Sequence, residues 1–163
     1  IVFIMEKRTI QSEISVCRKE ELDATEQLLI DKSIEATDRA YAVYSHFKVG
    51  AALLLANGEM VIGCNQENAA YPVTICAERS ALFSAGAQYP DQSVVAIAIA
   101  ARDENGNLLG EPITPCGSCR QALIETERRF GQKVKILLYG TKRIYVVDGI
   151  GQLMPLSFTD EMM

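Results

Sequence analysis

Near the middle of the sequence stands an unbroken apolar stretch, Val94-Val95-Ala96-Ile97-Ala98-Ile99-Ala100. Successive side chains of a strand point to opposite faces of the sheet, so a strand that is apolar at every position avoids water on both faces. We therefore expect a central strand here, in a sheet with helices packed on both faces.

The segments around this stretch predict a three-layer α/β/α architecture. Apolar residues recur at helical spacing from about Lys19 to Tyr41, and two more helices are expected to begin at Cys76 and Pro115. Asn57-Gly58 is a strong hairpin signal. Further strands are expected at residues 47–55, 60–64, 134–139 and 144–147, with a weak alternation at Ile14 and Val16. This order indicates an α/β fold with a mixed sheet of about five strands.

The composition is that of one globular domain. The chain has 163 residues, of which 48% are hydrophobic and 23% charged. We expect a single catalytic domain over residues 19–163 and an N-terminal extension over residues 1–18. The apolar residues 1–5 are too few for a signal peptide or a membrane span, so no membrane partner is expected, and Met5 is a candidate for the natural initiator.

The charge balance argues against a nucleic-acid polymer as partner. Sixteen basic and twenty-one acidic residues give a formal net charge of −5, and basic residues stand in pairs such as Arg128-Arg129. Proteins that bind polynucleotides usually carry a basic stripe, because neutralising phosphates supplies much of the affinity. We expect a smaller substrate.

Three of the five cysteines lie in two short segments, Cys76-Ala77-Glu78-Arg79 and Pro115-Cys116-Gly117-Ser118-Cys119-Arg120. With no secretory signal, the simplest setting is a reducing cytoplasm, where cysteine spacing indicates metal binding or catalysis before disulfides. Both segments stand where a helix is expected to begin, and a helix N-terminus stabilises the thiolate that binds metal.

The number of thiols favours a catalytic zinc site. Cys116 and Cys119 share a helix face, and Cys76 adds a third thiolate from a second helix. Three protein ligands and one open position are typical of catalytic zinc, whereas structural sites usually have four. A Cys-x-x-Cys pair alone could equally be redox-active or half of a structural site. The other candidate ligands lack a paired spacing: Cys17, Cys64 and the single histidine, His46.

Glu78 is the candidate proton carrier. On an exposed helix it would be one more first-turn carboxylate, stabilised by the helix dipole. Beside a water on zinc it could take a proton and deliver it to a ring nitrogen and a leaving amine.

Cys-Ala-Glu followed by Pro-Cys-x-x-Cys resembles the zinc signature of nucleoside and nucleobase deaminases. The order and spacing of four segments resemble the small homotetrameric cytidine deaminases: residues 47–53 (FKVGAAL), 63–71 (GCNQENAAY), 76–79 (CAER) and 115–121 (PCGSCRQ). The likeness runs from about Leu28 to Phe158. Gln66 stands where the family commonly has an aliphatic residue, and residues 72–75 form a variable loop that could shift substrate preference.

The resemblance implies a cytidine deaminase-like fold and zinc-dependent hydrolysis of cytidine and 2′-deoxycytidine to the uridines and ammonia, in pyrimidine salvage. It assigns site roles as follows: Glu78 for catalysis; Cys76, Cys116 and Cys119 for zinc; Asn65 and Glu67 for the ribose; Phe47 and the backbone of Ala77 for the base; and Arg79 for the thiolates. It also implies a homotetramer in which Phe158 enters a neighbour's active site. Read without the family, Asn65 and Glu67 shape a loop, and Phe47 and Phe158 are core aromatics. The role of Arg120 stays open.

Two other functions fit parts of the pattern. A related deaminase could act on an antibiotic or a polynucleotide, but the first type lacks the Asn-x-Glu-Asn-Ala loop and the second needs basic and aromatic channel residues. A zinc-stabilised binding module would leave Glu78 and the open coordination position unexplained. Ammonia release from cytidine separates these classes.

Overall fold

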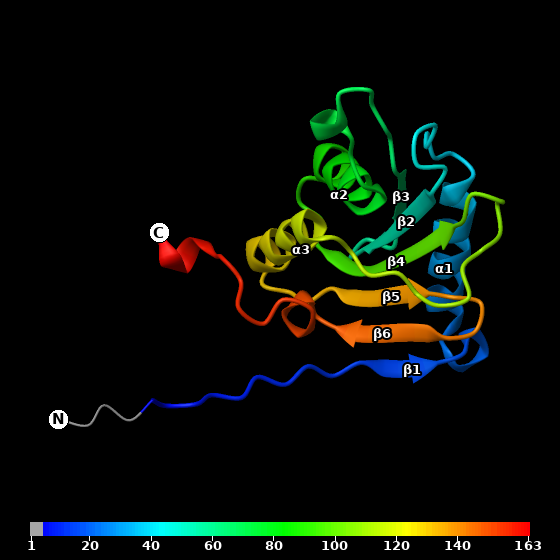
Figure 1. Cartoon of the computed structure of the whole chain (residues 1–163). Helices are drawn as coiled ribbons and strands as arrows, with labels where there is room; N and C mark the ends of the chain where they lie inside the picture. The colour runs from blue at the N-terminus through cyan, green and yellow to red at the C-terminus, as the bar shows by residue number, and fades with distance from the viewer. Residues whose placement is uncertain (1–4) are drawn as a thin grey trace.

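A six-stranded mixed sheet forms the centre of the computed structural model, which describes residues 5–163. The strand order is β1-β6-β5-β4-β2-β3 (Figure 1). The strands are β1 Ser15–Cys17, β2 Lys48–Leu55, β3 Met60–Cys64, β4 Val94–Arg102, β5 Lys135–Tyr139 and β6 Ile144–Asp148. β4 and β5 are parallel and the other neighbours are antiparallel, so the predicted mixed sheet is confirmed. The prediction for residues 1–4 lies outside the described residues.

The sheet has six strands where the sequence predicts about five. The additional strand is β1, in which Val16 pairs with Tyr145 of β6. β1 is three residues long, and Val16 is 60% exposed. A strand held by backbone pairing rather than by burial leaves only the weak alternation that the sequence contains. β1 lies inside the predicted extension 1–18, and the domain boundary at residue 19 stays a prediction.

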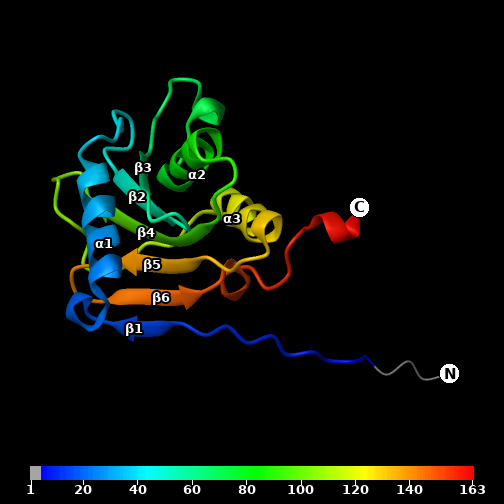
Figure 2. The same ribbon diagram turned by 180° about the vertical axis from the view of Figure 1, so that it is seen from behind.

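Three helices cover the sheet, α1 Ala24–Thr37 on one face and α2 Ala77–Gln88 and α3 Gly117–Phe130 on the other (Figures 1 and 2). Leu29 and Ile30 of α1 are buried against Ala52 and Ala98, while Leu82 and Leu123 of α2 and α3 lie in the opposite core layer. The three-layer prediction is therefore confirmed. In residues 5–163 no helix has the length and apolar character needed to cross a membrane.

The first helix is shorter than its predicted range of about 19–41. Asp23 caps α1 by accepting a hydrogen bond from the Glu26 amide at 2.8 Å, and the Glu26 carboxylate in turn accepts from the Asp23 amide in a capping box. Lys19–Glu21 form a separate 3-10 turn. The apolar periodicity thus extends beyond the helix, and the cap decides where the helix starts.

Gly63 lets α2 approach the sheet closely. A Cβ atom at Gly63 of β3 would lie 2.4 Å from the Ala81 amide nitrogen and 2.5 Å from the Ala77 carbonyl oxygen. Only glycine therefore fits beneath the first turns of α2, the helix that carries Glu78.

Candidate active site

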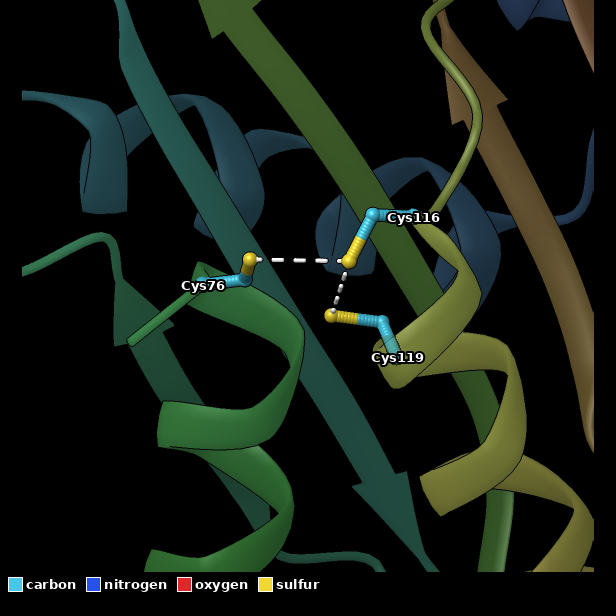
Figure 3. A group of neighbouring side chains, drawn as sticks. All are labelled: Cys76, Cys116 and Cys119. Atoms are coloured by element: carbon cyan, nitrogen blue, oxygen red, sulfur yellow. Dashed lines mark hydrogen bonds between the residues drawn. The ribbon is translucent and has the colours of Figure 1, made fainter. Parts of the chain in front are cut away.

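The thiols of Cys76, Cys116 and Cys119 meet where α2 and α3 begin (Figure 3). The Cys76 and Cys116 sulfurs are 3.7 Å apart, and the Cys116 and Cys119 sulfurs 3.5 Å apart. All three ligand atoms lie within 4.8 Å of one another. Residues 40 positions apart in the sequence thus form one sulfur cluster, as the sequence predicts.

Local backbone structure leaves the thiols available for a ligand. Cys76 and Cys116 are the N-cap residues of α2 and α3, with extended backbones, and neither side chain makes a capping hydrogen bond to the backbone of its helix. Cys119 lies in the first turn of α3 and is fully buried. Pro115 stands just before the N-cap rather than in the first helical position, because Cys116 takes the cap itself.

The cluster fits zinc in donor type and in size. Three sulfurs on a tetrahedral zinc with bonds of about 2.3 Å are about 3.8 Å apart, close to the two separations in this cluster. Within residues 5–163, this is the one group of three or more His, Cys, Asp or Glu side chains with such convergent ligand atoms. Zinc would be held by Cys76, Cys116 and Cys119, with the fourth position open for a non-protein ligand.

Electrostatics around Cys76 favour its thiolate. The Cys119 thiol and then the Arg79 guanidinium lower the pKa of Cys76 to about 5. The pKa of Cys119 is raised, because it keeps the proton that it shares with Cys76 and because it is buried. Arg79 Nη2 lies 3.9 Å from the Cys76 sulfur, and its Nε is buried without a hydrogen-bond partner in the structure. A cation here offsets the net charge of three thiolates around Zn²⁺.

Glu78 lies in the first turn of α2, two residues after Cys76, and only 4% of it is exposed. Burial raises the pKa of its carboxyl, and the charge on Cys76 adds to the effect. A carboxyl group with a raised pKa, beside three thiols that fit a metal ion, is suited to both accepting and donating a proton.

Asn65 ties the end of β3 to the start of β2. Its Nδ2 donates to the Phe47 carbonyl at 2.9 Å, and its Oδ1 accepts from the Val49 amide at 2.8 Å. One N–H of the Asn65 amide remains for a further acceptor. Asn65 therefore shapes this loop, the role that it has when read without the family, and keeps one donor for a ligand.

Glu67 faces the loop before β2. Its Oε2 accepts from the Tyr44 amide at 2.7 Å and from the Ser45 amide at 3.3 Å, and its Oε1 accepts from the Ser45 hydroxyl. The Ser45 hydroxyl bond and then the two backbone bonds hold the pKa of Glu67 below its ordinary value. Tyr44, Ser45 and Glu67 line a hollow of about 350 Å³, together with Tyr71 and Thr74.

A backbone pair joins this loop to the thiol cluster. The Gln66 amide donates to the Ile75 carbonyl at 3.0 Å, and the Ile75 amide donates back at 3.1 Å. Gln66 stands between Asn65 and Glu67, and Ile75 directly precedes Cys76. The two predicted halves of the site are therefore held side by side.

Comparison with known proteins identifies the family of the chain. Residues 23–133, more than half of the chain, match the model of the cytidine and deoxycytidylate deaminase zinc-binding region. The chain belongs to this deaminase family. A cytidine deaminase of Halalkalibacterium halodurans is 39% identical over 137 residues, which cover 84% of this chain and 96% of that protein.

Solved structures of cytidine deaminases share the fold. One from Burkholderia pseudomallei is 39% identical and superposes with a TM-score of 0.68, covering 80% of this chain and 97% of that one. One from Mycobacterium tuberculosis is 34% identical with a TM-score of 0.61, covering 84% of this chain and 99% of that one.

Three further residues that the sequence predicts for substrate binding, Ala77, Phe47 and Phe158, differ in burial and in their contacts. Ala77 is buried as the first residue of α2, beside Cys76. Phe47 is half-buried just before β2 and is tied to Asn65. Phe158 is 58% exposed on the C-terminal tail, where Gln121 of α3 donates to its carbonyl at 2.9 Å. The backbone of Phe158 is thus tied to α3 of its own chain, while its side chain stays largely exposed.

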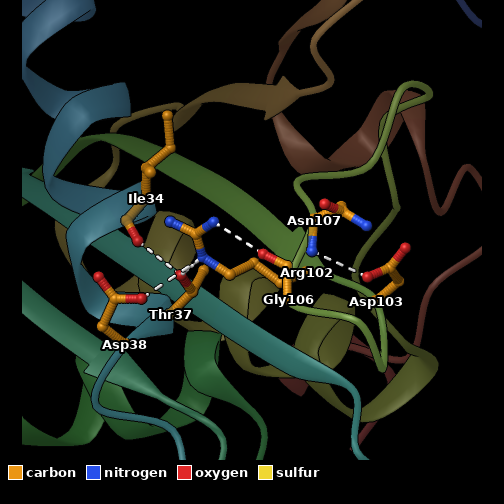
Figure 4. Close-up of polar contacts among 7 residues, drawn as sticks. All are labelled: Ile34, Thr37, Asp38, Arg102, Asp103, Gly106 and Asn107. Atoms are coloured by element: carbon orange, nitrogen blue, oxygen red, sulfur yellow. Dashed lines mark hydrogen bonds and ion pairs between the residues drawn. The ribbon is translucent and has the colours of Figure 1, made fainter.

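Three supporting residues have contacts that sequence reasoning did not assign. The Ser45 hydroxyl donates to the Glu67 carboxylate. In the sequence, only its position two residues before Phe47 points to Ser45, and this is a weak indication of a role in the site. Arg120 donates to the carbonyls of Pro115 at 2.8 Å and Leu153 at 2.6 Å, so it ties the loop before Cys116 to the tail. Arg102 at the end of β4 donates to the Thr37 hydroxyl at 2.7 Å and to the Gly106 carbonyl at 3.0 Å (Figure 4).

Proposed function

We propose that this chain catalyses hydrolytic deamination of cytidine and 2′-deoxycytidine, which yields uridine or 2′-deoxyuridine and ammonia. One observation carries the proposal: a buried carboxyl, Glu78, stands on the same helix turn as one of three convergent thiols that fit zinc. The family relationship and the cytidine deaminases that the chain resembles support the same chemistry.

Zinc held by Cys76, Cys116 and Cys119 would supply a Lewis acid that activates water as the nucleophile. Glu78 takes a proton from the attacking water and delivers it to N3 of the pyrimidine while the water oxygen adds to C4. Glu78 then moves the second proton to the amino group, the C4–N bond breaks, and ammonia leaves. Its raised pKa suits a group that must hold a proton between these transfers.

The loop around Asn65 and Glu67 would hold the sugar. Glu67 offers a carboxylate oxygen to the 3′-hydroxyl, and Asn65 offers its free N–H. Phe47 would line the pocket of the base, and the backbone of Ala77 would orient its edge. A site that pairs a substrate hydroxyl rejects analogues without it, because its own polar groups are then left unpaired.

The active enzyme would be a homotetramer with shared active sites, of about 72 kDa, four times the chain mass of 17.9 kDa. Phe158 would cover the base in a neighbour's site. Its exposure on a tail bound to α3 supports this role, as does a groove of about 620 Å³ between α2 and α3 that is lined by the exposed Phe83.

The setting that best suits this chemistry is the cytoplasm, where thiols remain reduced, and the role would be pyrimidine salvage. The catalytic domain would span residues 19–163. The net charge of −5 favours a free nucleoside over a polynucleotide.

A combined assay tests the proposal. Purified protein should contain about one zinc per chain, and its incubation with cytidine should release one ammonia for each uridine formed. Extraction with a strong chelator should abolish turnover, and added zinc should restore it. A metal-free sample with full activity would contradict the assigned zinc chemistry, and zinc-loaded protein that leaves cytidine unchanged would contradict the assigned reaction.

A further inference from the structure

Most of the accepting capacity of the Glu67 carboxylate is used by the protein itself. A carboxylate offers about four lone-pair sites, two on each oxygen. Oε2 accepts from the amides of Tyr44 and Ser45, and Oε1 accepts from the Ser45 hydroxyl. One site therefore remains, on Oε1, the oxygen that the Ser45 hydroxyl contacts.

The Ser45 hydroxyl has a second bond in the same loop. It accepts from the Phe47 amide at 3.1 Å, so one oxygen joins the carboxylate of Glu67 to the backbone of Phe47. His46, between the two, has a left-handed backbone with φ of 56°, and its amide donates to the Ala42 carbonyl at 3.0 Å. Such a backbone is uncommon for a residue with a side chain, and it stands directly after Ser45, the residue that contacts Glu67.

We propose that Ser45 is a positioning residue that fixes Glu67 as the acceptor of one substrate hydroxyl and links it to the pocket of the base. This inference rests on the proposed function, and it adds a cause for sugar discrimination. Because a single accepting site remains and the carboxylate cannot donate, the ligand group must be a donor. A 3′-hydroxyl meets this condition, whereas a 3′-deoxy sugar supplies no donor and a 3′-phosphate adds like charge.

A purely structural role for Ser45 would look different in experiment. The residue is exposed in the loop before β2, and substitutions at such surfaces usually change the free energy of unfolding little. Loss of a positioning hydroxyl should instead act on ligands according to whether they carry the 3′-hydroxyl. The informative quantity is therefore the preference for a nucleoside over its 3′-deoxy analogue, measured as the ratio of their KM values or of their affinities.

The test compares Ser45→Ala with Ser45→Thr, which keeps the hydroxyl, and with Ser84→Ala, which removes a hydroxyl of α2 that accepts from Gln88. For Ser45→Ala we expect KM for cytidine to rise about tenfold, kcat to stay within a few-fold, and the preference for cytidine over 3′-deoxycytidine to fall about tenfold. Ser45→Thr should recover most of the preference, and Ser84→Ala should keep all of it.

Calorimetric binding of uridine and 3′-deoxyuridine, which undergo no deamination, separates this inference from the proposed reaction. Loss of the 3′-hydroxyl preference in Ser45→Ala supports the inference even if wild-type protein fails to deaminate cytidine. An unchanged preference in Ser45→Ala would overturn it. So would a Ser45→Thr variant as defective as Ser45→Ala, or an equal loss of affinity for both sugars.

Discussion

Arg79 Nη2 lies 3.9 Å from the sulfur of Cys76, across one turn at the start of α2. Cys76 and Arg79 are three positions apart at the start of one helix, a spacing that places their side chains on the same face. Their contact therefore does not depend on distant parts of the fold. Arg79 is the charged donor that contacts the cluster, and its Nε is buried without a partner in the described structure. Its effect should therefore appear in the affinity of the cluster for metal.

Arg79→Gln should lower the affinity for zinc and the rate of deamination by about 10- to 100-fold, as is usual when a group that supports metal ligands is removed. The change removes the positive charge that offsets three thiolates. Competition with a chromogenic zinc chelator measures the affinity. Arg143→Gln, which breaks a surface ion pair with Glu111, is the matched control and should match wild type. Wild-type zinc affinity in Arg79→Gln would show that the guanidinium does not stabilise the thiolates.

Glu78→Gln should retain zinc and nucleoside binding but lose about 10²- to 10⁴-fold in kcat, because the amide cannot carry protons. Stability should be equal or higher, since burial already disfavours the charged form of Glu78. Steady-state kinetics, metal content and thermal melting together test this. Glu59→Gln, on the exposed hairpin, should leave all three unchanged. Activity of Glu78→Gln within a few-fold of wild type would mean that another group moves the protons.

Gly63→Ala should destabilise the protein by about 1–3 kcal/mol, because the new methyl group meets backbone atoms of α2 that cannot rotate away. For a chain of this size, each kcal/mol lowers Tm by about 2–4 °C. Denaturant unfolding gives the free energy directly. A methyl group added at Gly151 would meet no atom within 4 Å, so Gly151→Ala should change stability by less than about 0.5 kcal/mol. Equal stability of the two variants would contradict the close approach of α2 to β3.

The strongest sequence signals came from residues whose neighbours in sequence are also their neighbours in space. Cys116 and Cys119 share a helix turn, and the hairpin at Asn57-Gly58 closes within a few residues, with Gly58 at φ of 86°. These features were predicted to within one or two residues. Cys76, which is distant in sequence from Cys116 and Cys119, is also predicted as a member of the cluster, because the start of its helix can be recognised in the sequence.

Features that depend on tertiary contacts were missed or imprecise. β1 is defined by pairing with β6 more than a hundred residues away, so its own pattern is weak. The proposed role of Ser45 depends on its contact with Glu67, which is 22 residues later in the sequence. No local periodicity reports such a contact, because an exposed serine in a loop looks the same with or without a partner.

Phe158, exposed on the C-terminal tail, decides whether the active site belongs to one chain or is shared with a neighbour. Phe158→Ala should raise KM for cytidine, because an aromatic ring that stacks on the base and excludes water is lost. Light scattering should give about 72 kDa for wild type, four times 17.9 kDa. A fully active monomer at assay concentration would rule out a shared site.

Mixed assemblies distinguish the two arrangements. Glu78→Gln chains have no proton carrier but keep Phe158, and Phe158→Ala chains keep Glu78. If Phe158 acts in a neighbour's site, tetramers co-expressed from both chains contain sites that combine an intact Glu78 with an intact Phe158, and part of the activity should show the wild-type KM. If Phe158 covers its own chain's site, every site with Glu78 has Ala at position 158, and KM should stay raised at all mixing ratios. Phe158 is 58% exposed in the single chain, so its ring is available to a neighbour, which favours the first result.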